Sequence, residues 1–329
     1  MLRPERFWYQ GARPPLWTLP LGRLFCSLAG LRRWAYRRGL ASVHRLPVPV
    51  IVVGNIAVGG TGKTPLVIWL ARRLQARGWR PGIVSRGYKG QAERWPLAVS
   101  ADSPPHLVGD EPVLIARRTG CPLWVGPDRV DAARALLAAA ECDIILSDDG
   151  LQHYRLGRDL EIAVIDGERR LGNCRCLPAG PLREVPARLD AVDLLVCNGG
   201  QPRAREFGMG LRPGVLVNLR QPGRERELAS LAGQRVLALA GIGNPGRFFA
   251  LLRAAGLEVE ERAFPDHHEY RAADLPPAAD PRALLMTEKD AVKLAGMARD
   301  NYWYLPVEAE LDPVFEHRLD LLLKGFDDG

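Results

Sequence analysis

The stretch VIVVGNIAVGGTGKT, residues 50–64, decides the fold. It begins as a short apolar run, typical of a strand buried in a parallel sheet, and continues as a glycine-rich turn. Glycines allow backbone N–H groups to turn toward phosphate oxygens, and a helix beginning near Lys63 points its positive end at the same place. Lys63 would reach the β- and γ-phosphates of a nucleotide, and the Thr64 hydroxyl would bind Mg²⁺. The predicted phosphate-binding residues are Gly59, Gly60, Thr61, Gly62, Lys63 and Thr64.

This loop departs from the strict pattern G-x-x-x-x-G-K-[ST], because Ala57 stands where the first glycine belongs. The intact sequence Gly62-Lys63-Thr64 still lies between an apolar strand and a helical stretch. That context favours an ATP-binding P-loop over a glycine-rich turn without a ligand.

Short apolar runs alternate with amphipathic stretches, which predicts parallel strands joined by crossover helices. The predicted strands cover 50–54, 82–85, 123–125, 143–147, 161–165 and 193–197, and the helices 63–77, 111–118 and 129–140. A second pattern predicts strands at 235–240, 257–263 and 283–287 and helices at 247–255 and 289–295. The expected fold class is α/β: a P-loop NTPase-like, doubly wound, mostly parallel sheet with a second, smaller α/β domain and an amphipathic N-terminal helix.

Composition divides the chain into five segments. Residues 1–45 form a basic amphipathic segment, residues 46–205 the P-loop core domain, and residues 226–305 the smaller α/β domain. Residues 206–225 belong to a stretch rich in Gly, Pro and Arg that is typical of a connector. The tail, residues 306–329, is expected to pack back on the core domain.

The positive charge is concentrated at the N-terminus. The first 50 residues hold nine arginines and one acid, although the whole chain carries only +7. On a helix from about Leu21, apolar residues share one face and arginines lie roughly opposite. This pattern is typical of a helix in the interface of an anionic membrane; packing on the protein's own core is the alternative. Interleaved Leu and Trp fit lipid better than nucleic acid. The apolar face consists of Leu21, Leu24, Phe25, Leu28, Leu31 and Ala35.

Neither a membrane-spanning helix nor a cleaved signal peptide is expected, because arginines such as Arg23, Arg32 and Arg33 interrupt every apolar stretch of this segment. The catalytic body is therefore expected in the cytoplasm. The six cysteines are scattered, and Cys174 and Cys176 have no second pair that would complete a zinc site. We predict reduced thiols, most of them buried.

Acidic residues at the end of a second apolar strand predict a metal site. Asp148 and Asp149 follow the run Ile144-Ile145-Leu146-Ser147. An acid at this position beside a P-loop commonly anchors Mg²⁺, and two adjacent carboxylates repel each other without a cation. For two further groups the pattern is ambiguous. Asp110 precedes Glu111-Pro112, which is equally typical of a helix N-cap, and His267 falls in a predicted turn.

In series, the motifs resemble those of tetraacyldisaccharide 4′-kinases, the lipid A 4′-kinases of Gram-negative bacteria. The resemblance spans nearly the whole chain: GN-x3-GGTGKTP (54–65), SRGYK (85–89), GDEP (109–112), SDDGLQH (147–153), LPAGPLRE (177–184), GIGNPGRFF (241–249), FPDHHEY (264–270) and TEKDAVKL (287–294). It implies transfer of the ATP γ-phosphate, with Mg²⁺, to the 4′-hydroxyl of a tetraacylated glucosamine disaccharide 1-phosphate, which gives lipid IVA. It also implies a glycolipid substrate, no nucleic-acid partner, and peripheral or monotopic association with the cytoplasmic face of the bacterial inner membrane; we expect a monomer.

The same resemblance implies roles for individual residues. Asp110 resembles the catalytic carboxylate, paired with His267 rather than His268 because of the Asp-His order. The implied metal ligands are Thr64, Asp148, Asp149 and Glu184, and the implied substrate-binding residues are Tyr88, Arg129, His153 and Arg183. Asp110 and His267 fall in different predicted domains, so they can meet only if those domains close over ATP.

Two other functions are compatible with a P-loop. The first is a soluble small-molecule kinase, in which the apolar and basic N-terminal segment would have no role. A switch or partitioning ATPase often carries a lysine just before the two glycines of the loop, where this chain has Val58.

Overall fold

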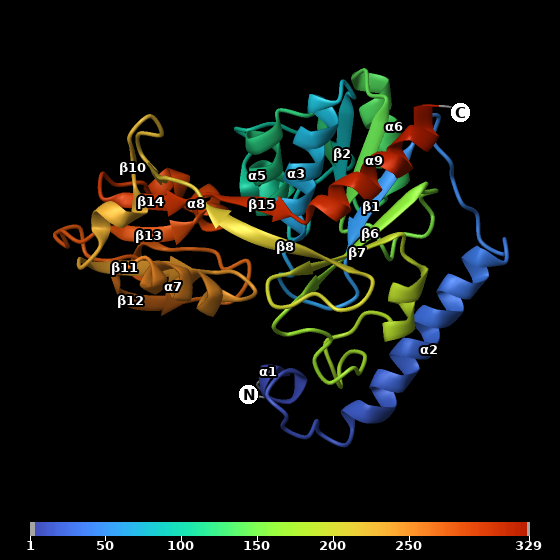
Figure 1. Cartoon of the computed structure of the whole chain (residues 1–329), viewed down its shortest axis with the longest axis horizontal. Helices are drawn as coiled ribbons and strands as arrows, with labels where there is room; N and C mark the ends of the chain where they lie inside the picture. Colours follow the sequence, from blue (N-terminus) through green and yellow to red (C-terminus); the bar gives the residue numbers. More distant parts are fainter. Residues whose placement is uncertain (1–3, 328–329) are drawn as a thin grey trace.

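The computed structural model describes residues 4–327 and contains two β-sheets, which lie in separate parts of the molecule (Figure 1). We call them the large-sheet part and the small-sheet part. The first three residues of the predicted segment 1–45 and the last two of 306–329 lie outside the described residues.

The large sheet has nine strands in the order β15-β8-β7-β6-β1-β5-β2-β4-β3, and all are parallel to their neighbours except β3 and β15. This order places the P-loop strand β1 near the centre of the sheet. The strands are β1 (Val50–Gly54), β2 (Pro81–Ser85), β3 (Leu97–Val99), β4 (Leu123–Val125), β5 (Ile144–Asp148), β6 (Leu160–Asp166), β7 (Leu194–Asn198), β8 (Glu206–Pro213) and β15 (Val307–Leu311).

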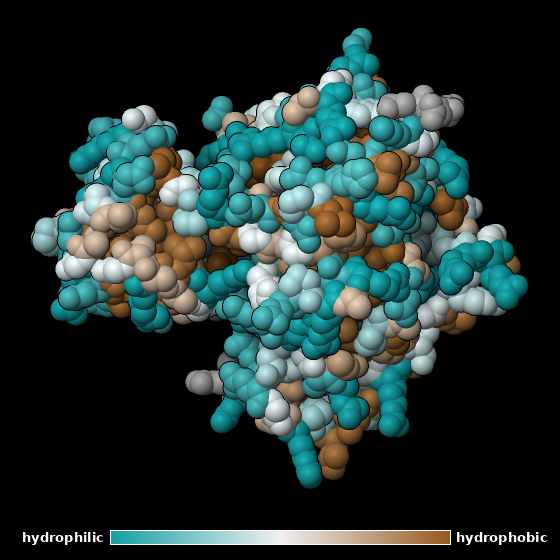
Figure 2. All heavy atoms as spheres, viewed as in Figure 1, coloured by the Kyte–Doolittle hydropathy of each residue, from teal (hydrophilic) through white to brown (hydrophobic). Residues whose placement is uncertain are grey.

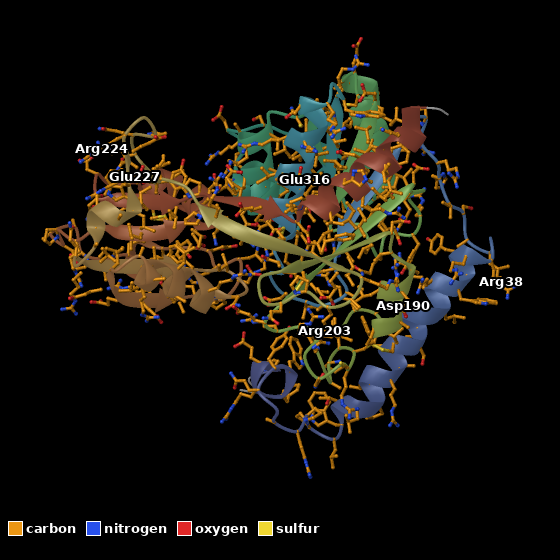
Figure 3. The ribbon with its side chains drawn as sticks, viewed as in Figure 1. Arg38, Asp190, Arg203, Arg224, Glu227 and Glu316 are labelled. Atoms are coloured by element: carbon orange, nitrogen blue, oxygen red, sulfur yellow. A yellow bond between two sulfur atoms is a disulfide. The ribbon has the colours of Figure 1, made fainter. Side chains whose placement is uncertain are left out.

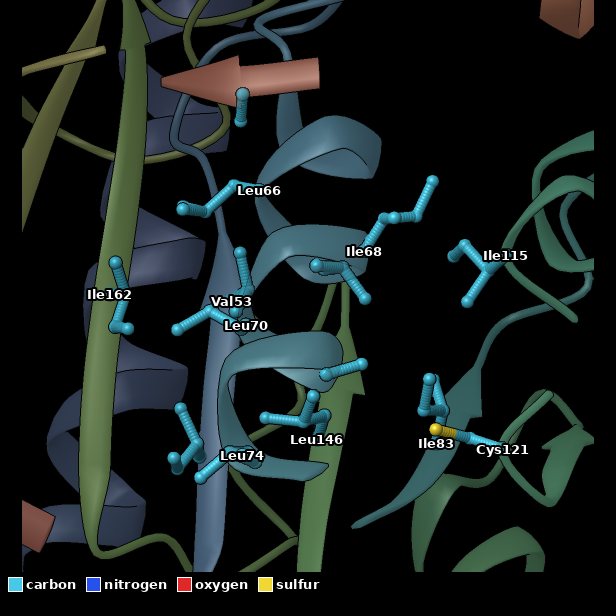
Figure 4. Close-up of a cluster of buried hydrophobic side chains, with 14 of the residues drawn as sticks. Val53, Leu66, Ile68, Leu70, Leu74, Ile83, Ile115, Cys121, Leu146 and Ile162 are labelled. Atoms are coloured by element: carbon cyan, nitrogen blue, oxygen red, sulfur yellow. The ribbon is translucent and has the colours of Figure 1, made fainter. Parts of the chain in front are cut away.

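Helices cover both faces of this sheet, which confirms the predicted doubly wound fold. Alternate residues of a strand point to opposite faces. Ile51 and Val53 pack with α3, α5 and α9, whereas Val50 and Val52 pack with α6. Figure 4 shows part of the first cluster, with Leu66, Leu70 and Leu74 of α3 lying over the sheet. These helices are α3 (Lys63–Ala76), α5 (Asp110–Thr119), α6 (Arg129–Ala139) and α9 (Pro313–Asp327); the short α4 is Pro105–Val108.

The small sheet has six strands in the order β10-β9-β14-β13-β11-β12, of which β11 to β14 are parallel. α7 packs on one face and α8 on the other. The elements are β9 (Leu216–Asn218), β10 (Glu225–Arg226), β11 (Arg235–Ala240), β12 (Glu258–Ala263), β13 (Leu284–Thr287), β14 (Tyr302–Leu305), α7 (Pro245–Ala254) and α8 (Glu288–Leu294). Short 3-10 turns cover Pro186–Ala191, Leu228–Leu231, Ala272–Asp274 and Ala295–Met297.

The chain crosses between the two sheets twice, from β8 to β9 and from β14 to β15. The two crossings lie side by side, because the Gly214 N–H donates to the Pro306 carbonyl at 2.9 Å. Residues 206–225 thus contain β8, β9 and the first residue of β10, and the link proper is shorter than the composition indicates. Only Met209 of β8 is buried, so this strand lacks the apolar pattern that reveals a buried strand.

The N-terminal segment forms α1 (Pro4–Trp8) and α2 (Thr18–Arg37), and α2 runs along the outside of the large-sheet part (Figure 1). Only Thr18 and Gly22 of α2 are buried, and Arg38 extends outward just beyond its end (Figure 3). No helix within residues 4–327 is long and apolar enough to cross a membrane.

One prediction about the cysteines is wrong. Cys26 of α2 and Cys176 form a disulfide, whereas Cys121, Cys142, Cys174 and Cys197 are free thiols and all but Cys174 are buried. The two partners are 150 residues apart in the sequence, so their pairing depends on α2 lying against the loop before Arg183. Sequence spacing carries no sign of this contact.

Candidate active site

The P-loop joins β1 to α3 in a conformation that requires glycine. Gly59 and Gly62 have φ angles of 104° and 91°, which disfavour residues with a Cβ. A Cβ on Gly62 would also lie 2.1 Å from Asn198 Nδ2, and that amide donates to the Thr61 carbonyl at 3.0 Å. Asn198, at the end of β7, therefore supports the loop from the side. All six predicted residues, 59–64, line the main cavity of the described chain.

Asp149 forms ion pairs with two cationic side chains beside this loop, Lys63 and Arg183. Its carboxylate lies 3.4 Å from Lys63 Nζ and accepts hydrogen bonds of 3.1 Å from Arg183. Burial opposes the charge of Asp149, but Lys63 and Arg183 hold its pKa well below the usual range. Lys63 is thus held at the mouth of the P-loop by its ion pair with Asp149.

Asp148, the last residue of β5, is buried, and its Oδ2 accepts from Ser85 Oγ at 2.9 Å. Its Oδ1 has no hydrogen-bond partner among residues 4–327. Burial, together with the charges of Glu111 and Asp149, raises the pKa of Asp148 to about 7. This buried carboxylate oxygen can therefore accept a further hydrogen bond or bind a cation.

These residues fit Mg²⁺. This ion prefers oxygen ligands and is commonly held by one or two carboxylates together with phosphate oxygens and water. The orphaned Asp148 oxygen, Asp149 and the Thr64 hydroxyl offer such a set. Glu184 does not join them as a cluster, and within residues 4–327 no three His, Cys, Asp or Glu side chains converge on one point. The Glu184 carboxylate instead accepts from Tyr154 and, at 3.0 Å, from Gln152.

Asp110 and His267 meet although 157 residues separate them. Asp110 begins α5 in the large-sheet part, and His267 follows β12 in the small-sheet part. His267 Nδ1 lies 3.0 and 3.1 Å from the two carboxylate oxygens of Asp110. Lys289 Nζ lies 3.3 Å from His267 Nε2, so Nε2 can accept from the ammonium while Nδ1–H donates to Asp110. The pair therefore bridges the two parts.

Lys289, the second residue of α8, holds this arrangement together. Its ammonium donates to Glu111 at 2.8 Å and to Asp266 at 3.0 Å, and it lies 3.9 Å from Asp110. Burial disfavours its charge, but Glu111, Asp110 and Asp266 raise its pKa above the usual range. For Asp110, burial is outweighed by the hydrogen bond from His267 and the charge of Lys289, and its pKa is held well below the usual range. Asp110 is an anion at neutral pH.

The parts enclose a cavity of about 970 Å³. Its walls include the P-loop, Asp149, Arg183 and Glu184 from the large-sheet part, residues 242–244, His267 and Lys289 from the small-sheet part, and Phe25, Ala29 and Arg32 from α2. A small adjoining cavity contains Asp110, Asp148 and Ser85 and shares His267 with the main one. His267 thus lines the same cavity as the P-loop, and Asp110 lines the smaller cavity beside it.

The four predicted substrate-binding residues divide into two groups. Tyr88 and Arg183 line the cavity, and the ring of Tyr88 meets that of His267 edge to face at 5.2 Å. Arg129 is buried, and its guanidinium donates to the backbone oxygens of Gly126, Pro127 and Asp149.

His153, the fourth of these residues, accepts from the Arg129 N–H at 3.3 Å and lies 3.4 Å from Asp128. Burial and nearby arginines lower its pKa to about 4. Neither Arg129 nor His153 is among the residues that line the cavity. Their predicted contact with substrate stays a prediction.

Sequence reasoning assigned no role to three residues of this site: Lys289, Glu111 and Asn198. Lys289 lies in the quoted motif TEKDAVKL and Glu111 in GDEP. Both motifs can be recognised in the sequence. The contacts of the Lys289 ammonium with Asp110 and His267 cannot, because they form between the two parts of the folded molecule. Asn198 stands at the end of an apolar strand, as Asp148 does. This position was the only feature of the sequence that indicated a place for Asn198 in the site.

The fold and the site define a P-loop phosphotransferase: a phosphate-binding loop with its lysine, an acidic strand end, and a carboxylate–histidine pair that line two adjoining cavities. Comparison with known proteins gives the family. Residues 15–324 match the model of the tetraacyldisaccharide-1-P 4′-kinase family, and the chain belongs to this family. The predicted resemblance is thereby confirmed.

Relatives match along almost their whole length. The chain is 53% identical to a tetraacyldisaccharide 4′-kinase of Nitrosococcus oceani over 97% of this chain and 94% of that protein. It is 54% identical to that of Alkalilimnicola ehrlichii over 96% of both. A crystal structure of LpxK from Aquifex aeolicus in complex with ATP is 32% identical, has a TM-score of 0.78, and covers 94% of this chain and 98% of its own.

Proposed function

We propose that this protein transfers the γ-phosphate of ATP to the 4′-hydroxyl of a tetraacyldisaccharide 1-phosphate, which forms lipid IVA at the cytoplasmic face of the bacterial inner membrane. The observation that carries the proposal is the Asp110–His267 pair, which joins the two parts of the molecule and whose histidine lines the same cavity as the P-loop. The Asp110 carboxylate of this pair is an anion that can accept a hydrogen bond from the acceptor hydroxyl group near the nucleotide site.

The P-loop binds the phosphate donor. Backbone N–H groups of residues 59–64 bind the phosphates, and Lys63 exchanges its contact with Asp149 for a contact with the β- and γ-phosphates. Mg²⁺ held by Thr64, Asp148 and Asp149 would neutralise charge on the transferring group. Arg183 lies beside Asp149 and is placed to meet a second anionic group.

At the acceptor end, Asp110 accepts a hydrogen bond from the 4′-hydroxyl and orients its oxygen toward the γ-phosphorus. Phosphoryl transfer builds little charge on the attacking oxygen until late, so a carboxylate of low pKa acts first by positioning and receives the proton as the O–P bond forms. His267 fixes the Asp110 carboxylate, and Lys289 fixes His267. Tyr88, Arg129 and His153 are proposed to bind or shape the disaccharide site, and Glu184 supports it through Tyr154 and Gln152.

Membrane association is proposed to occur through α2. The side chains of Leu21, Leu24, Leu28 and Leu31 are each 47% exposed or more, so they are available to lipid rather than packed on the protein. In Figure 2, apolar residues reach the surface at the lower right, where α2 lies in the same view. A helix with such a stripe and flanking arginines binds an anionic interface by burying its apolar side.

The test uses γ-labelled ATP, Mg²⁺ and purified tetraacyldisaccharide 1-phosphate in detergent micelles. We expect label in the lipid with the wild-type protein, loss of transfer on chelation of Mg²⁺, and at least a hundredfold loss in Lys63→Ala, about 2.7 kcal/mol of transition-state binding. Lys324→Ala, which removes an exposed lysine of α9, is the matched control. ATP hydrolysis without a labelled lipid would favour a switch ATPase, and label in a water-soluble acceptor would favour a small-molecule kinase.

A further inference from the structure

The helix α2 is fixed against the large-sheet part at both of its ends. Near its start, Gly22 packs so closely on the loop before Arg183 that a Cβ would lie 2.9 Å from the Cys176 carbonyl, and Cys26 is bonded to Cys176. Near its end, the Tyr36 ring lies 5.9 Å from that of Tyr154. The direction in which each face of α2 points is therefore set by the fold.

Between these anchors, one stripe of α2 faces the cavity. Phe25, Ala29 and Arg32 all line it, and their spacing of four and three residues puts them on the same side of a helix. The exposed leucines form the neighbouring stripe. At 3.6 residues per turn, Leu28 comes about 40° around the helix from Arg32. Arg32 thus lies at the border between the cavity and the apolar surface of α2.

The charge of Arg32 is not used inside the protein. Within residues 4–327, no carboxylate makes an ion pair with it and no hydrogen bond joins it to another residue. By contrast, Lys63 and Arg183 contact Asp149, and Lys289 contacts three carboxylates. A guanidinium without a partner at a cavity edge is suited to bind a phosphate with two parallel hydrogen bonds.

The proposed acceptor carries one phosphate, at the end of the disaccharide opposite the 4′-hydroxyl. Arg129 and His153 are turned toward the backbone and toward Asp128, and neither lines the cavity. With acyl chains along the leucine stripe, the 1-phosphate comes to the cavity edge while the 4′-hydroxyl extends inward toward Asp110. A lipid phosphate also lies at the depth of an interfacial helix.

We propose that Arg32 binds the 1-phosphate of the glycolipid acceptor at the edge of the cavity and so selects substrates that carry this group. This proposal rests on the proposed function, because it concerns the acceptor of the same reaction. It assigns to α2 a role in substrate recognition in addition to membrane binding.

The test compares two acceptors, the tetraacyldisaccharide 1-phosphate and its 1-hydroxyl analogue, in micelles of a neutral detergent without phospholipid. We expect Arg32→Ala to raise KM for the 1-phosphate acceptor about tenfold or more, the worth of a charge-assisted hydrogen bond, with little change in kcat. For the 1-hydroxyl acceptor, the variant and the wild type should have equal KM values. Arg23→Ala, which removes an exposed arginine from another side of α2, should behave as wild type with both acceptors.

Three results would overturn this proposal: an unchanged KM for the 1-phosphate acceptor, an equal increase for both acceptors, or an effect that appears only in vesicles containing phosphatidylglycerol. The last result would mean that Arg32 binds a phospholipid headgroup. A wild-type protein that labels neither acceptor contradicts the proposed function instead. Equilibrium binding of the two glycolipids to wild type and Arg32→Ala then decides the role of Arg32 separately, with tighter binding of the 1-phosphate lipid to wild type as the supporting result.

Discussion

Around the cavity, burial and neighbouring charges set the state of single side chains. Asp110 is an anion of low pKa because the hydrogen bond from His267 and the charge of Lys289 outweigh its burial, whereas burial and the charges of Glu111 and Asp149 raise the pKa of Asp148 to about 7. The first carboxylate is therefore ready to accept a hydrogen bond, and the second is ready to accept a cation.

Asp110→Asn tests the first of these roles. The substitution keeps the size of the side chain and removes its charge, so we expect kcat for lipid phosphorylation to fall by about 10² to 10⁴ while KM for ATP stays near the wild-type value. Steady-state kinetics with labelled ATP measure both. Asp102→Asn, at an exposed position, is the control. A turnover within a few-fold of wild type in Asp110→Asn would refute the role of this carboxylate.

His153 predicts a pH dependence of stability. Its pKa is lowered from 6.5 to about 4, so the folded state binds fewer protons than the unfolded state between these values. Stability is then present in full above the unfolded pKa and is lost as the pH falls through this window, by no more than about 3 kcal/mol. The free energy of unfolding, measured with urea, should therefore be lower at about pH 4.5 than at about pH 7. We expect His153→Asn to remove the part of this difference that comes from His153. His106→Asn, at an exposed histidine, should retain it, and an unchanged difference in His153→Asn contradicts the account.

The sequence predicts residues whose role depends on local structure and not those whose role depends on distant contacts. Lys63 and Thr64 follow from one strand, one turn and one helix. Asp110 and His267 come from distant segments, and only the resemblance to a family paired them. Lys289 lies in the motif TEKDAVKL, but the motif alone does not indicate its position in the site, because its contacts to Glu111 and Asp266 arise only in the folded chain.

At the scale of elements, the alternation of apolar and amphipathic stretches predicted the central strands and their helices closely. It failed for exposed or edge strands such as β8 and β15, whose side chains are only partly buried. It also gave no sign of the Cys26–Cys176 bond, which depends on where α2 lies. The apolar face of α2 was predicted, but whether that face is covered is decided by packing, and the structure leaves Leu24 and Leu31 more than half exposed.

The exposed stripe of α2 predicts membrane binding. We expect Leu24→Gln with Leu28→Gln to weaken co-sedimentation with phosphatidylglycerol vesicles by about tenfold or more, because burying one leucine contributes roughly 1.5–3 kcal/mol. Both side chains are exposed, so thermal stability should not change. Val314→Gln, at an exposed apolar residue of α9, is the matched control. Undiminished binding of the double variant would exclude this stripe as the membrane contact.

At the scale of the whole molecule, the two parts are joined by two adjacent crossings and by the contacts of His267 and Lys289 with α5. We predict that ATP closes the parts further or more persistently, since residues of both line its cavity. Small-angle scattering should give a smaller radius of gyration with a non-hydrolysable ATP analogue and Mg²⁺ than without. Equal radii would rule out this motion as part of the reaction.

The central claim is that Asp110 and His267, one from each part, act as a unit in phosphate transfer to the glycolipid. A double-mutant cycle measures this directly, with the rate of label transfer from ATP to tetraacyldisaccharide 1-phosphate compared in wild type, Asp110→Asn, His267→Gln and the double variant. If the pair is a unit, the double variant should be no slower than Asp110→Asn alone, because His267 acts through the carboxylate. Independent losses that multiply in the double variant would contradict the account.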